Sequence, residues 1–366
     1  MMPRKPARPS RTRPRKKKKR GHVAVLRRPA KPFWADYEDE DLLDLRICDL
    51  GLRFEGTEIL SRIERLYDEL AERGLKLRPH IWFSSEWFSP DGVPGIAVPY
   101  YLGHERLTRL EEKMMLKAEG GGERECMRIL RHEMGHVICS AYRLHFKPSW
   151  RSVFGKFTER YPDSYVPKPK SRRFVQHLDW FYAQAHPAED FAETFAVWLT
   201  PYSRWKQQYA NWPALKKIEY VDELMSEIAG AMPVVRSRMH VEPVKGMRVT
   251  LRDHYRKKQQ DYETDWPDFY DRDLRRIFSE EERFVDNETA AAFLRRSRSE
   301  IRDTVADWTG AHPYTIEHVL RDMIDRCKEL KLRVMLNQRF TRLQATLMIT
   351  VQSMKFLQGG GQRIVL

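Results

Sequence analysis

The pentapeptide HEMGH, His132 to His136, most constrains what this chain can fold into. On an α-helix the two histidines lie four residues apart on one face, so both imidazoles can bind one metal ion while Glu133 lies beside it. Two histidines leave a catalytic Zn²⁺ site underfilled, because such a site normally has three protein ligands and a water. The motif therefore predicts a helix here and a third ligand elsewhere in the chain.

The segment HPAEDFAETFAVWL, residues 186–199, offers that third ligand. Its pattern predicts a helix that begins at Pro187 and ends before Pro201. Two acids and two alanines share one helical face; they are Glu189, Ala192, Glu193 and Ala196. The alanines would let this helix approach another helix closely, so that Glu189 completes a His₂Glu set and Glu193 holds a liganding imidazole by its other N–H. The alternative interpretation is a solvated acidic strip.

Together, HEMGH and the downstream YAQAHPAEDFAETFAVWL resemble the bacterial family of putative zinc-binding metallopeptidases, which is itself similar to the gluzincins. The resemblance covers about residues 80–200. It implies a zinc-dependent hydrolase in which His132, His136 and Glu189 bind Zn²⁺. It also implies that a zinc-bound water attacks a peptide or amide bond, with Glu133 as the general base.

Tyr182 lies seven residues before Glu189. In some gluzincins a tyrosine at about this offset faces the zinc and donates a hydrogen bond to the oxyanion, so the resemblance makes Tyr182 a catalytic candidate. The alternative is a core aromatic beside Trp180 and Phe181.

Two further side chains near the motifs admit two interpretations each. Cys139 follows His132 by seven residues, so it is either a thiolate ligand or, as we expect, a small buried hydrophobe. His186 could bind metal or substrate, but its place before Pro187 favours a residue at the helix entry. A metzincin site does not fit, because Cys139 and Tyr142 stand where that motif requires Gly and His.

The positive charge of the chain is concentrated at its start. The net charge is +14, yet residues 1–32 hold 14 Lys or Arg and no acid, so 52 basic residues balance 52 acidic ones in the remainder. This Pro-rich tail, residues 1–33, is predicted to be disordered. It could contact nucleic acid or another polyanion weakly, or act as a solubilising extension.

Four scattered cysteines without CxxC spacing argue against a disulfide framework, and no apolar run approaches a membrane span. A cytoplasmic protein fits this pattern best.

The predicted fold class is α+β. A zincin-like metallopeptidase domain is expected over residues 40–235 and a helical accessory region over residues 248–366. The apolar patterns predict a strand near residues 42–50, a helix over 58–73 and a helix that includes residues 316–327. Two strands joined through SPDG are predicted in HIWFSSEWF and GIAVPYYL. Because proline cannot donate a hydrogen bond to a neighbouring strand, Pro99 predicts that the second is an edge strand. An exposed edge could pair with an extended peptide.

The expected partner is a peptide or protein substrate, and the oligomeric state is left open. A second hypothesis is a nucleic-acid-associated protein with a structural zinc site and a basic tail. Such a site would be closed by a fourth protein ligand and would not need Glu133.

Overall fold

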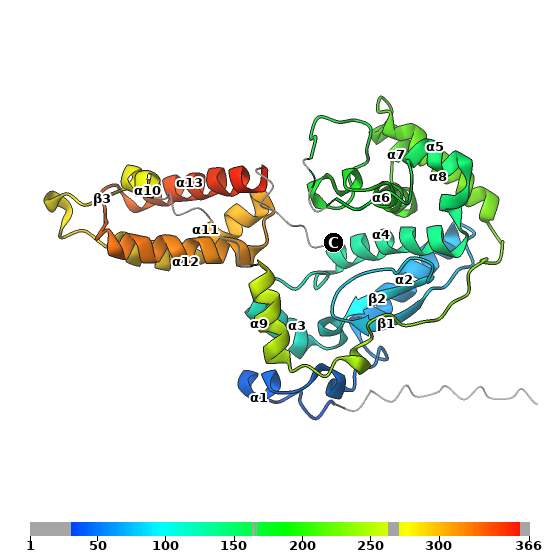
Figure 1. The fold of residues 1–366 in the computed structure, drawn as a ribbon, viewed down its shortest axis with the longest axis horizontal. Helices are drawn as coiled ribbons and strands as arrows, with labels where there is room; N and C mark the ends of the chain where they lie inside the picture. The colour runs from blue at the N-terminus through cyan, green and yellow to red at the C-terminus, as the bar shows by residue number, and fades with distance from the viewer. Residues whose placement is uncertain (1–30, 163–164, 166, 263–270, 359–366) are drawn as a thin grey trace, which may run out of the picture. The chain divides into compact units, whose positions relative to one another are not determined.

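The computed structural model describes residues 31–162, 165, 167–262 and 271–358 (Figure 1). The predicted disordered tail lies outside the described residues except at its last three positions. Helices prevail in the described part, and its named strands form two short two-stranded sheets. The structure is therefore mixed α and β, with fewer strands than helices. None of the helices described has the length and apolar composition of a membrane span.

The elements between Lys31 and Tyr262 surround a main hydrophobic core, and Trp82, Val93 and Ala97 form a smaller separate cluster. These elements are α1 (Asp39–Leu43), η1 (Ile47–Leu50), α2 (Glu58–Glu72), β1 (His80–Ser84), β2 (Gly95–Pro99), η2 (Tyr100–Gly103), α3 (Glu105–Met115), α4 (Glu123–Ala141), η3 (Leu144–Phe146), α5 (Pro148–Phe154), η4 (Asp179–Gln184), α6 (Pro187–Leu199), α7 (Trp205–Gln208), α8 (Ala214–Ile228), η5 (Val244–Gly246) and α9 (Leu251–Tyr262).

Several predicted helices of this part are confirmed. α2 begins after Thr57, whose hydroxyl accepts a hydrogen bond from the Leu60 amide, and its apolar stripe is buried. The prediction of a strand near residues 42–50 is wrong, because these residues include the end of α1 and the whole of η1. Acids crowd the first turn of α1, where the helix dipole favours them, and Leu43, Ile47 and Leu50 are buried at helical rather than alternating spacing.

The two predicted strands around residues 80–99 are confirmed, but they pair in parallel, with Trp82 opposite Ala97. The connecting segment runs back along the other edge of β2, where Phe88 forms an antiparallel bridge to Ala97. β2 is thus paired on both sides at Ala97, and all five of its residues are buried. β2 is an edge strand of this two-stranded sheet, as predicted, but its edge is buried rather than exposed.

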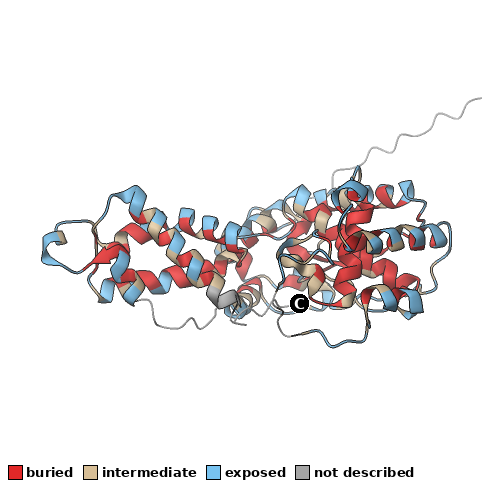
Figure 2. Cartoon of the chain, turned by 90° about the horizontal axis from the view of Figure 1, so that it is seen from above, coloured by how far each residue is buried: buried red, intermediate tan, exposed pale blue. Residues whose placement is uncertain are grey.

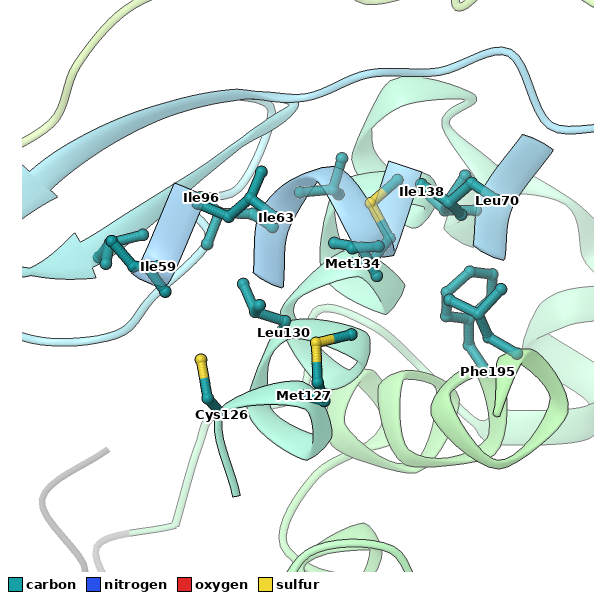
Figure 3. Close-up of a cluster of buried hydrophobic side chains, with 14 of the residues drawn as sticks. Ile59, Ile63, Leu70, Ile96, Cys126, Met127, Leu130, Met134, Ile138 and Phe195 are labelled. Carbon is teal, nitrogen blue, oxygen red and sulfur yellow. The ribbon is translucent and has the colours of Figure 1, made fainter. Parts of the chain in front are cut away.

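α4 is the central helix of this core. Figure 3 shows Leu130, Met134 and Ile138 of α4 facing side chains of α2, while Phe195 of α6 approaches α4 from another side. Most residues of α4 from Cys126 onward are buried as a result. Figure 2 shows buried residues, in red, along many of the helices. A β-carbon added at Gly135 would stand 2.6 Å from the Cα of Ala192 in α6, so the two backbones approach each other as closely as a glycine allows.

A second hydrophobic core is formed by the elements from Asp271 onward. They are α10 (Asp271–Ile277), β3 (Phe278–Ser279), η6 (Glu282–Phe284), α11 (Ala290–Thr309), α12 (Pro313–Glu329), β4 (Arg333–Val334) and α13 (Gln338–Gln358). The stripe predicted for residues 316–327 is confirmed as the buried face of α12. The division into domains at 40–235 and 248–366 stays a prediction, and α9 contributes Leu251 and Tyr255 to the first core.

The close approach of α4 and α6 generates a test. In an ordinary helix interior, Gly→Ala adds about 0.5–1 kcal/mol of stability. In Gly135→Ala the new methyl group meets backbone, so we expect the free energy of unfolding in urea to fall by about 1–3 kcal/mol. Gly246→Ala is the matched control, because no atom lies within 4 Å of its added β-carbon. A Gly135→Ala variant as stable as this control would contradict the packing argument.

Candidate metal centre

The three predicted metal ligands come together between α4 and α6. The Nε2 atoms of His132 and His136 lie 3.2 Å apart, since the two residues are one turn apart on α4. Glu189, in the first turn of α6, places its Oε2 atom 3.0 Å from His132 Nε2 and 3.2 Å from His136 Nε2. The three side chains form a group that could hold a metal ion.

The shape of this group fits zinc. Ligand atoms about 2.0–2.1 Å from a tetrahedral Zn²⁺ lie about 3.3 Å from one another. The triangle formed by the two nitrogens and the oxygen has sides of 3.0–3.2 Å, close to that value. Two imidazole nitrogens and one carboxylate oxygen are also a donor set that catalytic zinc sites use.

Glu193 orients His132. Its Oε1 atom lies 2.8 Å from His132 Nδ1, which leaves Nε2 to face the other two ligand atoms. Its Oε2 atom accepts hydrogen bonds from the amides of His177 and Leu178, at 3.3 and 2.8 Å. A carboxylate that holds the far nitrogen of a liganding histidine fixes the ring orientation and its tautomer. Glu193 thus lies against His132, and its role beside a metal ligand stays a prediction.

The electrostatics of the ligand group favour positive charge beside its carboxylates. Burial alone would raise the pKa of Glu189, but His136 and His132 hold it well below its ordinary value, so this carboxylate stays ionised. Burial likewise opposes a charged His132, but hydrogen bonds to Glu189 and Glu193 outweigh it and raise the His132 pKa well above the usual range. A cation at the centre of the group would be attracted by the ionised Glu189 carboxylate.

Glu133 lies beside the ligand group with a free carboxylate oxygen. The residue is buried, and among the described residues its Oε2 atom has no hydrogen-bond partner. Its main-chain oxygen accepts a hydrogen bond from Ser89 Oγ at 3.2 Å. A buried oxygen left without a partner costs free energy unless water or a ligand supplies one, so this atom is available to a group entering the site.

Tyr182 lies at the ligand group and outside the hydrophobic clusters. Its ring centroid is 5.5 Å from that of His132, and the residue is half-buried. Trp180 and Phe181, directly before it in η4, both have left-handed backbone conformations, with φ of 66° and 59°. Such conformations cost free energy in residues with a β-carbon and are found most often at functional sites. Burial, with Glu189 and Glu133 nearby, raises the pKa of Tyr182, so its hydroxyl keeps its proton.

Cys139 and His186 stand apart from the ligand group. Cys139 is buried, and its nearest polar neighbour is His145 Nδ1, at 3.6 Å from the sulfur. All four cysteines are free. His186 is the N-cap of α6 and accepts a hydrogen bond from the Ala188 amide, which is the helix-entry role expected of it.

Tyr161 is a residue of the site that the sequence motifs did not indicate. Its hydroxyl donates a 2.8 Å hydrogen bond to Glu189 Oε1, the carboxylate oxygen that faces away from the two histidines. Its ring stacks on that of His186 at 3.8 Å. Tyr161 lies in an irregular segment between α5 and η4, where no periodic pattern could have signalled it.

The α6 helix has a second buried anchor next to Glu189. Asp190 is buried and pairs with Lys217 of α8. The Lys217 ammonium also lies 4.3 Å from the centroid of the Phe174 ring. This ion pair ties the first turn of α6, which carries the candidate ligand Glu189, to α8.

A comparison with protein-family models identifies the part of the chain that holds this group. Residues 111–222 match the putative zinc-binding metallo-peptidase family. The resemblance predicted from HEMGH and the downstream motif is thereby confirmed, and zinc is the metal that the family's description names. Both α4 and α6 lie within this metallopeptidase segment, residues 111–222. Searches of curated proteins and of solved structures found no match.

The hydrogen bond from Tyr161 gives a test inside the metallopeptidase segment. Tyr161→Phe removes the hydroxyl that fixes the outer oxygen of Glu189, so we expect zinc affinity to fall about tenfold, as for other partners of metal ligands. Tyr165→Phe is the matched control, because that hydroxyl bonds the main-chain oxygen of Trp180 and no ligand. Competition with a fluorescent chelator measures both affinities. Equal zinc affinities in the two variants would show that Tyr161 does not support Glu189.

Proposed function

We propose that this protein is a gluzincin-like zinc metallopeptidase of zincin-like fold that hydrolyses a peptide or amide bond. The observation that carries the proposal is the convergence of His132, His136 and Glu189 beside the free carboxylate oxygen of Glu133. The match of residues 111–222 to a metallo-peptidase family supports the same chemistry. The three ligand atoms leave one position of a tetrahedral site open, which hydrolysis requires.

Zn²⁺ held by the three ligands would supply Lewis-acid chemistry, polarising the scissile carbonyl and making a water molecule more acidic. Glu133 takes the proton of that attacking water on its free Oε2 and then delivers a proton to the leaving amine. Glu193 keeps His132 in the tautomer that presents Nε2, through the 2.8 Å contact to Nδ1. Tyr182 donates its hydroxyl proton in a hydrogen bond to the oxyanion that forms as the carbonyl becomes tetrahedral.

The alternative with a structural zinc site would need a fourth protein ligand. The described residues bring only three ligand side chains together, and the fourth neighbour is an acid suited to proton transfer. We therefore favour the peptidase over a nucleic-acid-associated protein with structural zinc.

Two single substitutions separate metal binding from chemistry. Glu189→Ala removes one of three ligands, so we expect most of the zinc to be lost during dialysis. Glu133→Gln leaves all three ligands in place, so it should keep zinc at the wild-type level and lose hydrolysis, because an amide cannot accept the proton. Metal analysis and digestion of a peptide library measure the two properties. Full zinc in Glu189→Ala, or hydrolysis by Glu133→Gln, would overturn the assignment concerned.

The role of Tyr182 is tested by removing its hydroxyl alone. A hydrogen bond formed mainly in the transition state affects the chemical rate far more than substrate binding. Tyr182→Phe should therefore fold and retain zinc, with a kcat at least about tenfold lower and a nearly unchanged KM, since one oxyanion donor is worth on the order of 10²–10³ in kcat elsewhere. A kcat close to that of the wild type would leave oxyanion binding to the metal.

A further inference from the structure

Six exposed cations gather on the irregular segment that carries Tyr161. They are Lys156, Arg160, Lys168, Lys170, Arg172 and Arg173, and we call them the cationic rim. Among the described residues none of the six forms an ion pair, although Arg172 lies 6.0 Å from the Trp212 ring centroid. Exposed cations elsewhere are often paired, as Arg65 is with Glu123. The rim is therefore a local excess of positive charge in a body that is neutral beyond residue 32.

Several contacts fasten this segment to the elements that build the metal centre. Besides the Tyr161 bond to Glu189, the main-chain oxygen of Glu159 lies 3.0 Å from His186 Nε2 at the start of α6. Lys168 exchanges two hydrogen bonds with Gln184 of η4 through its backbone alone. The ammonium group of Lys168 has no ion-pair partner among the described residues, so backbone contacts position the segment while this charge faces solvent.

The acidic residues near the segment do not cancel the positive charge of the cationic rim. Glu159 is the one acidic residue among its described positions and makes no ion pair with the described residues. Asp91, from the connection between β1 and β2, also comes near: after burial and Glu189, it contributes to the raised pKa of Tyr161. The segment also contains Asp163 in its sequence, outside the described residues, so three carboxylates stand against six cations. At about 0.1 M salt, each of these exposed charges acts over about 10 Å.

We propose that the substrates of this metallopeptidase are acidic peptide segments, which the cationic rim attracts and orients toward the metal centre. The inference rests on the proposed function and adds to it the class of substrate. Asp and Glu side chains that flank the scissile bond would meet the unpaired cations of the rim, whereas basic ones would be repelled. A peptide fits better than a nucleic acid because the segment is joined directly to the ligand Glu189 and to η4, which carries Tyr182.

The test compares two fluorogenic peptides of the same length, one with Asp and Glu around the scissile bond and one with Asn and Gln. At about 30 mM salt we expect kcat/KM to be roughly threefold to tenfold higher for the acidic peptide. In about 0.5 M salt this ratio should approach one, because exposed charges are then screened. A ratio of one at low salt, with both peptides hydrolysed, would overturn the proposal and leave the peptidase intact. Hydrolysis of neither peptide by zinc-loaded protein would overturn the proposed function itself.

Two double variants assign the preference to the rim. Lys168→Gln with Lys170→Gln removes two of its charges and keeps the backbone bonds to Gln184, so the acidic-to-neutral ratio should fall at least about twofold. Arg272→Gln with Arg339→Gln removes two equally exposed cations that form no ion pair among the described residues and lie in α10 and α13. This control should keep the wild-type ratio. Equal loss in both variants would attribute the preference to net charge and overturn the rim as its source.

A competition experiment separates the proposed substrate from other polyanions. Poly-glutamate should inhibit cleavage of the acidic peptide at low salt more strongly than single-stranded DNA of equal charge. Stronger inhibition by DNA, lost in Lys168→Gln with Lys170→Gln, would make the rim a nucleic-acid site and overturn the proposal.

Discussion

The close approach of α4 and α6 at Gly135 and Ala192 is the contact on which the candidate site depends. A carboxylate can share a metal with two histidines of another helix only if the two backbones lie close together, because the Glu189 side chain is short. Glycine and alanine permit this distance, and any larger residue at position 135 would push the helices apart. The same contact brings Glu193 within 2.8 Å of His132.

Burying three acids on one helix is costly unless each has a partner. On α6, Glu189 faces the two histidines and Tyr161, Asp190 pairs with Lys217, and Glu193 is held by His132 and two backbone amides. The partners come from α4, α8 and irregular segments, so α6 is fixed from several directions. This arrangement accounts for buried carboxylates in the part of the chain that matches a zinc-binding family.

Local patterns predicted the helices well and the sheet only in part. The helices α2, α4, α6 and α12 follow from apolar stripes, caps and prolines, all of which act within a few residues. The direction of pairing between β1 and β2 depends on the path of the ten residues between them, which no local pattern records. In residues 42–50, predicted to form a strand, Leu43, Ile47 and Leu50 are buried at helical spacing.

The sequence by itself determined which residues could form the metal site, because helical spacing puts His132 and His136 on one face and the alanines beside Glu189 suggest a close helix partner. Only the tertiary structure decided that these faces meet, with ligand atoms 3.0–3.2 Å apart. The tertiary structure also decided that Tyr161 contacts Glu189 and that the segment with the cationic rim lies beside it. This segment has no period, and its place beside Glu189 results from contacts between residues far apart in the chain.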